Sequence, residues 1–432
     1  MSPGTRTVTD IPAPDGQLKQ RYPSLDGLRG AASFVVLICH TLMIQPALLQ
    51  AYIDPKVIPR GTQAWWVTFS PLHLPWAGME MVYLFFILSG FVLALPFTHG
   101  RHRGWAGYFP KRFLRLYPPA WGAFALALFW ITVFPRHFSV TDSAWLQVHP
   151  QVLESAAIRG DLLLINGPMG SNSVLWTLRF EVLFSLLLPL LVLLSRRLRK
   201  LNLLKVGVLL GVIVALANPG MTMPYFLSMF FLGTLMAVER DRLARIGLRI
   251  RMMKHSRAVW WGLTILSLLL LNAYWTVGGL TTDPRRLAYL IPVARVISVV
   301  ASCMIIFLCV EGTWRRQFEK RPLEWLGRRT YSLYLVHEPI VVTVALLLGG
   351  SPGPLLSLMV AIPASLAVTA VFYAVIERPS QRFSRVVGAR VDRWRDRVGG
   401  PKLERPPLTV HEPVRLPLET ADLVVDPPVT KV

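Results

Sequence analysis

The chain contains about ten runs of apolar residues, each near 20 residues long. A helix of that length crosses the hydrocarbon core of a bilayer, which is roughly 30 Å thick. We therefore predict an all-α polytopic membrane protein with about ten transmembrane helices. The predicted spans are 25–49, 80–97, 119–135, 174–195, 203–219, 221–239, 258–276, 289–311, 330–350 and 352–376. The apolar segment 62–76 is interrupted by Pro71 and Pro75, which predicts an interfacial or re-entrant piece rather than a span.

The positive charge of the chain is concentrated in alternate loops between these runs. The chain has a net charge of +22, and basic side chains cluster within 101–115, 196–205, 240–257 and 315–329. The intervening loops hold at most two basic residues each. By the positive-inside rule the basic loops are cytoplasmic, so an even number of spans puts both termini in the cytoplasm. This placement accounts for the charge without nucleic-acid binding. The predicted location is a cell membrane, with the bacterial cytoplasmic membrane as the expected one.

The two ends of the chain differ from the apolar region between them. Residues 1–21 are polar and form a predicted cytoplasmic tail without a cleavable signal peptide. Residues 22–380 form the predicted membrane domain, and 381–432 a cytoplasmic tail. Within the tail, apolar residues recur every three or four positions among arginines, at Phe383, Val387, Val391, Trp394 and Val398. This pattern predicts a basic amphipathic helix on the anionic inner leaflet, followed by a Pro-rich disordered segment.

Ionisable residues inside spans are costly, so each of them is a functional hypothesis. Arg29 and His40 are eleven residues apart, which puts them on one helix face and about 16 Å apart along the axis. This spacing predicts Arg29 at the cytoplasmic boundary and His40 near the middle of the bilayer. A snorkelling arginine and a packed structural histidine remain the alternative.

Further polar residues lie in or beside later spans. Arg179 and Glu181 share the fourth predicted span but point to different sides, so each needs a partner on another helix. His337 precedes Glu338 and Pro339, where a proline can free backbone groups. A structural ion pair and a kink with satisfied polar groups are the alternative readings of these two positions.

The first basic loop contains a pair of arginines three residues apart, Arg112 and Arg115. On a helix they would form one cationic face that suits a phosphate group. Ordinary topology-setting charge is the alternative. The three cysteines lie inside apolar runs, and their spacing offers neither a disulfide framework nor a metal site. No resident metal or permanently bound cofactor is predicted.

Six stretches, in order, resemble the acyltransferase-3 family of integral membrane O-acyltransferases. They are Leu25–Gly30 followed by His40, Phe85–Phe91, Arg112 and Arg115 ahead of Tyr117-Pro118, Leu175–Leu178 with Glu181, Tyr331–His337, and Glu377-Arg378-Pro379. Two positions depart from the family pattern. Tyr83 stands where relatives often carry an acid, which Glu80 could supply from the same helix face, and Ser185 stands where many have tyrosine.

The resemblance implies transfer of an acyl group, commonly acetyl, from cytoplasmic acyl-CoA to a hydroxyl of a carbohydrate or glycoconjugate, such as a surface polysaccharide or glycolipid. It assigns catalytic roles to His40, Arg29 and Glu181, and donor binding to Arg112, Arg115 and Arg29. A buried neutral histidine is suited to accept the proton of the hydroxyl. Acylation of a sugar on a macrolide-type secondary metabolite is an alternative. A non-enzymatic transporter or flippase of lipid-linked sugars is another.

Overall fold

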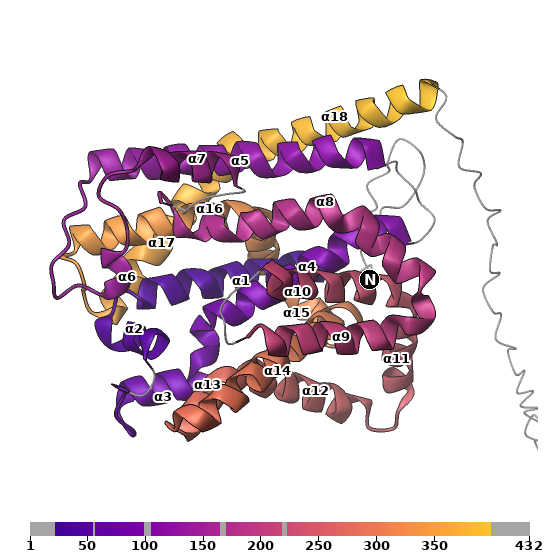
Figure 1. Cartoon of the computed structure of the whole chain (residues 1–432), viewed down its shortest axis with the longest axis horizontal. Helices are drawn as coiled ribbons and strands as arrows, with labels where there is room; N and C mark the ends of the chain where they lie inside the picture. Colours follow the sequence, from indigo (N-terminus) through magenta and orange to yellow (C-terminus); the bar gives the residue numbers. More distant parts are fainter. Residues whose placement is uncertain (1–21, 55–56, 99–104, 165–169, 218–222, 399–432) are drawn as a thin grey trace, which may run out of the picture.

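The long helices of the molecule lie side by side and build one all-α body (Figure 1). The computed structural model describes residues 22–54, 57–98, 105–164, 170–217 and 223–398. Within these ranges every regular element is a helix, which confirms the predicted fold class. The long helices are α1 (Pro23–Leu42), α4 (Gly78–Thr98), α5 (Trp105–Val133), α8 (Trp176–Arg197), α14 (Pro284–Glu311), α16 (Arg321–Leu347) and α17 (Pro354–Phe372).

The remaining helices are shorter and connect or cover the long ones. They are α2 (Pro46–Ile53), α3 (Gln63–Phe69), η2 (Pro71–Trp76), α6 (Ala144–Gln147), α7 (Ser155–Leu163), η3 (Ser173–Leu175), η4 (Arg199–Leu201), α9 (Asn202–Ala215), α10 (Met223–Val238), α11 (Arg240–Met252), α12 (Ser256–Leu271), α13 (Ala273–Leu280), α15 (Trp314–Phe318), η5 (Tyr373–Glu377) and α18 (Arg378–Arg397). The helices α3 and η2 occupy the segment predicted as interfacial, and neither is long enough to cross a bilayer.

Seven of the described helices are long and apolar enough to cross a membrane. The pair α12 and α13, bent by 57°, would be the eighth span. The chain is thus a multi-pass membrane protein. Every predicted span coincides with a helix or helix pair, but the count of ten is not confirmed. Two of the predicted spans correspond to α9 and α10, which have 14 and 16 residues. These helices are only about 21–24 Å long, which is shorter than the hydrocarbon core.

The start of α5 differs most from the sequence prediction. The predicted span began at residue 119, whereas the helix begins at Trp105 and passes through Pro110, Pro118 and Pro119. The sequence analysis missed the first half of α5 because it contains prolines and basic residues, and both argue against a membrane helix. As a consequence, Arg112 and Arg115 lie within a helix and not in a loop.

The first half of α5 is supported by α18, which runs alongside it (Figure 1). The backbone N–H of Gly107 on α5 donates to Asp392 on α18 at 3.0 Å. The predicted amphipathic helix therefore exists, but it follows α17 through η5 and packs on α5 through its small residues Ser380 and Gly388. Phe383 and Trp394 are exposed, and their contact with lipid stays a prediction. The predicted tails at 1–21 and 399–432 lie outside the described residues.

The backbones of α1 and α16 touch at glycines. A Cβ atom on Gly30 would lie 2.6 Å from the backbone nitrogen of Gly327. Contacts this close between helices need small residues, which membrane helices commonly use to pack without a hydrophobic driving force. This approach fixes α1 against α16.

Candidate active site

A pair of histidines joins α1 to α16. His337 Nε2 lies 3.0 Å from His40 Nδ1, and the two rings stack with centroids 5.0 Å apart. His40 is in the last turn of α1, close to the end of the helix opposite Arg29. The helix α1 ends at Leu42, whereas the predicted span ran to residue 49, and the mid-bilayer position of His40 stays a prediction. The continuous helix from Pro23 to Leu42 does keep Arg29 and His40 on one face.

The hydrogen bonds of this pair fix which nitrogen carries each proton. His337 Nδ1 lies 3.0 Å from the carbonyl oxygen of Leu333, which can only accept, so Nδ1 carries a hydrogen. In neutral His337 the Nε2 atom is then an acceptor, and His40 must donate to it from Nδ1. The lone pair of His40 is left on Nε2, which has no hydrogen-bonding partner among the described residues. When both rings are neutral, His40 therefore keeps one nitrogen available as a base.

A third histidine lies on the other side of His40. Trp145 of α6 packs against the His40 ring at a centroid distance of 5.4 Å and against His149 at 4.6 Å. His149 Nε2 lies 3.0 Å from a carboxylate oxygen of Glu338, which is buried. Glu338 also accepts from the backbone N–H groups of Ser173 and Val174, at 2.7 and 3.1 Å. This network ties η3 and the segment that follows α6 to α16 beside the histidine pair.

Glu181 is paired with Arg112 and does not contact His40. Arg112 Nη2 lies 3.0 Å from Glu181 Oε2, and Arg112 Nε donates to Ser185 Oγ at 2.8 Å. Ser89 of α4 donates to the other oxygen of Glu181 at 3.1 Å. The carboxylate thus links α4, α5 and α8. Arg179, its neighbour in sequence, is exposed and lies against the Phe180 ring.

Arg29 and Arg115 are accessible cations next to this ion pair. Neither donates a hydrogen bond or forms an ion pair within the described part of the chain, and Arg115 is exposed. The charges of Arg112 and Glu181 act on both of them, which places the four side chains in one neighbourhood. Two free guanidinium groups beside a neutralised arginine suit a polyanionic group such as a phosphate.

The last stretch that resembles the family, Glu377-Arg378-Pro379, contacts the helix that carries His337. Glu377, at the end of the π-turn η5, accepts from the backbone N–H of Ser332 on α16 at 3.0 Å and also from its hydroxyl. Ser332 lies five residues before His337 on the same helix. The Glu377-Arg378-Pro379 and Tyr331–His337 stretches therefore meet in space, although 45 residues separate Glu377 from Ser332.

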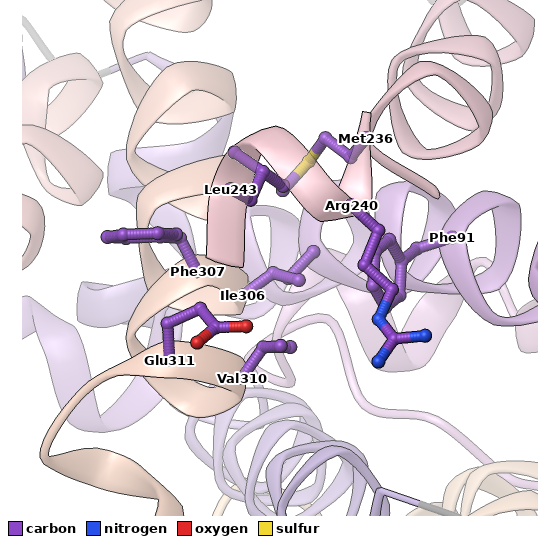
Figure 2. Close-up of a pocket in the computed structure, with 8 residues that line it drawn as sticks. All are labelled: Phe91, Met236, Arg240, Leu243, Ile306, Phe307, Val310 and Glu311. Carbon is purple, nitrogen blue, oxygen red and sulfur yellow. The ribbon is translucent and has the colours of Figure 1, made fainter. Parts of the chain in front are cut away.

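Two cavities elsewhere in the molecule are not lined by the residues of this site. Figure 2 shows a cavity of about 10 Å³ between α4, α10, α11 and α14, which is about the size of one water molecule. Its lining residues are Phe91, Met236, Arg240, Leu243, Ile306, Phe307, Val310 and Glu311. A groove of about 310 Å³ between α5 and α17 is lined by apolar side chains and glycine.

Comparison with known proteins agrees with this arrangement. The acyltransferase domain model of the acyltransferase-3 family matches residues 22–374. The chain belongs to the acyltransferase-3 family. A relative, the acyltransferase MdmB of Streptomyces mycarofaciens, is 27% identical over 399 residues, covering 84% of this chain and 92% of that protein. No solved structure matches. The protein is an acyl-transferring enzyme, as its sequence motifs predicted.

The family motifs occupy two regions joined by α1. Arg29, Arg112, Arg115 and Glu181 gather toward one side, and His40 with His337 lies toward the other end of α1. Glu80 belongs to neither region: it is buried at the start of α4 and accepts from Trp275 Nε1 at 3.0 Å.

Sequence reasoning missed part of the histidine region. Trp145 and His149 lie in a segment between two predicted spans, and the sequence pattern of that segment carries no signal of its own. Glu338 was visible only as the neighbour of His337. An acid next to a histidine inside an apolar span was the available hint, because such a residue needs a buried partner.

Proposed function

We propose that this enzyme transfers an acetyl group from cytoplasmic acyl-CoA to a hydroxyl of a carbohydrate or glycoconjugate, with His40 as the general base. The observation that carries the proposal is the unpartnered Nε2 of His40, whose other nitrogen is engaged by His337. A hydroxyl is a weak nucleophile near neutral pH, and a positioned base typically contributes about 10²- to 10⁴-fold.

The reaction follows from that lone pair. His40 Nε2 takes the proton of the acceptor hydroxyl while its oxygen attacks the thioester carbonyl carbon. The tetrahedral intermediate then expels the sulfur, the C–S bond breaks, and the thiolate takes the proton from His40. The products are the acyl ester and free CoA thiol. His337 accepts from His40 Nδ1–H throughout and stabilises the imidazolium that forms.

The donor is proposed to lie along α1 between the arginines and His40. Arg29 and Arg115 offer unpaired guanidinium groups to the CoA phosphates. Arg112 is engaged by Glu181, so we assign it a positioning role next to the phosphates. The distance from Arg29 to His40, about 16 Å along the helix, is comparable to the reach of a pantetheine arm.

The test uses the purified protein in nanodiscs with acetyl-CoA, and thiol release as the readout. His40→Ala should bind acetyl-CoA but lose nearly all turnover, and His40→Gln should be almost as slow, because glutamine cannot act as an efficient base. His73→Phe is the matched control, since His73 is also buried but lies in an aromatic cluster with Trp76 and Trp275. Near-normal turnover in well-folded His40→Gln would refute the proposed base.

Donor binding is tested separately by titrating acetyl-CoA into the Arg115→Ala variant. The loss of one charge-assisted contact should weaken binding about 10- to 100-fold. Wild-type affinity in both Arg29→Ala and Arg115→Ala would remove the donor site from this position. Mass spectrometry of glycans, glycolipids and secreted metabolites from a deletion strain would identify the acceptor.

A further inference from the structure

The His40 side chain is bordered by an aromatic ring from a distant part of the chain. Trp145 belongs to α6, between α5 and α8, and its ring centroid lies 5.4 Å from that of His40. The indole is partly exposed. Its Nε1 atom has no hydrogen-bonding partner among the residues that the structure describes. A flat apolar face and a free N–H donor therefore lie next to the proposed base.

Buried polar contacts hold this ring in place. His149 Nδ1 lies 2.7 Å from the carbonyl oxygen of Trp145, and His149 Nε2 lies 3.0 Å from Glu338. Both ring nitrogens of His149 are thus engaged, one by the backbone of Trp145 and the other by the Glu338 carboxylate. Glu338 follows His337 directly in α16. One helix thus positions the partner of His40 and, through His149, the tryptophan beside it.

We propose that Trp145 binds the acyl acceptor, as the residue on which the carbon face of a sugar ring stacks while one of its hydroxyls reaches His40 Nε2. The inference rests on the proposed function and assigns its acceptor site. An indole offers a large rigid apolar face together with a polar edge. A pyranose ring matches both, because it has a face of C–H groups and a rim of hydroxyls.

The position of Trp145 also sets the direction of approach. Arg29 lies toward the other end of α1, about 16 Å from His40 along the helix, and Arg115 of α5 lies in its neighbourhood. Trp145 belongs to the α6 end, which Figure 1 shows beside α2 and away from the start of the described chain. Donor and acceptor therefore reach His40 from opposite ends, and neither has to leave before the other binds.

The experiment compares two acceptor probes, methyl β-glucopyranoside and glycerol, with the full chain in nanodiscs and acetyl-CoA. Both probes carry hydroxyls, but only the glucoside has a ring face. The wild type should release thiol faster with the glucoside. Trp145→Ala should raise the apparent KM for the glucoside about tenfold and leave the Kd for acetyl-CoA unchanged. Trp145→Phe, which keeps an aromatic face, should recover most of the loss.

The matched control is Trp66→Ala, since Trp66 is an exposed tryptophan of α3 whose ring packs against Trp65. Its kinetics should equal those of the wild type. A wild-type KM for the glucoside in Trp145→Ala, or no preference of the wild type for the glucoside over glycerol, would overturn the inference and leave the proposed function intact. A wild type that neither binds acetyl-CoA nor releases thiol with either probe would overturn the proposed function itself.

Discussion

Replacing His337 tests whether the free lone pair of His40 is set by its neighbour. In His337→Ala, His40 Nδ1–H loses the acceptor that lies 3.0 Å away, and the imidazole is no longer held in the tautomer with Nε2 free. During the reaction this hydrogen bond is to an imidazolium, and hydrogen bonds to charged groups contribute about 1.5–3 kcal/mol. At 1.4 kcal/mol per factor of ten, kcat should fall about 10- to 150-fold.

The conservative variant separates this role from simple packing. In His337→Gln, the amide oxygen can accept from His40 Nδ1–H while the amide nitrogen donates to Leu333, as the histidine does. We expect kcat within about tenfold of the wild type for glutamine and the full loss for alanine, with the acetyl-CoA Kd unchanged in both.

The measurement is thiol release at saturating acetyl-CoA and acceptor, from nanodisc preparations whose thermal unfolding shows a folded protein. The reasoning would be refuted by an alanine variant with kcat within threefold of the wild type. It would also fail if the glutamine variant were as slow as alanine, because then the acceptor at Nε2 would not be the feature that matters.

Three further predictions concern the frame around the site. Glu181→Gln leaves Arg112 without its counter-charge and should lower the free energy of unfolding by about 3 kcal/mol. This is the low end for a broken buried pair, because Glu181 is 21% exposed. The double variant Glu181→Gln with Arg112→Gln should recover part of that loss in denaturant titrations. Gly30→Ala should lower both the melting temperature and kcat, because its Cβ would lie 2.6 Å from the Gly327 backbone; unchanged values would show that α1 can shift at no cost. Burial lowers the pKa of His73 to about 3, below its ordinary value of 6.5. The unfolded chain therefore binds the proton more readily than the folded one. The free energy of unfolding should fall as the pH drops from 6.5 toward 3, by up to about 1.4 kcal/mol per pH unit. Melting temperatures of His73→Phe over that range should depend less on pH than those of the wild type.

The sequence predicted the helices well where length and apolarity agree, as in α4 and α14. It failed at α5, where prolines and basic side chains suggested a loop. That half of the helix is stabilised by α18, which a local pattern does not reveal. It also extended α1 to residue 49, whereas the helix ends at Leu42.

The sequence predicted individual residues of the candidate site but not the contacts between them. His40, Arg29 and Glu181 stood out because ionisable groups in apolar helices are rare. Their partners depend on which helices touch, and a single sequence does not give that. The spacing of Arg112 and Arg115 suggested one cationic face, whereas Glu181 engages the first and leaves the second unpaired.

The distance in sequence between His40 and His337 affects how the enzyme is made. The two residues are 297 positions apart, so α1 is synthesised long before the helix that pairs with it. Until α16 emerges from the ribosome, Arg29 and His40 must face lipid, other early helices or the insertion machinery, and a bare polar group in hydrocarbon is costly. A chain that terminates before α16 keeps most of the spans but has no site. Nascent chains stalled at that length should therefore be targets for membrane proteases, which would remove an inserted but unfinished enzyme.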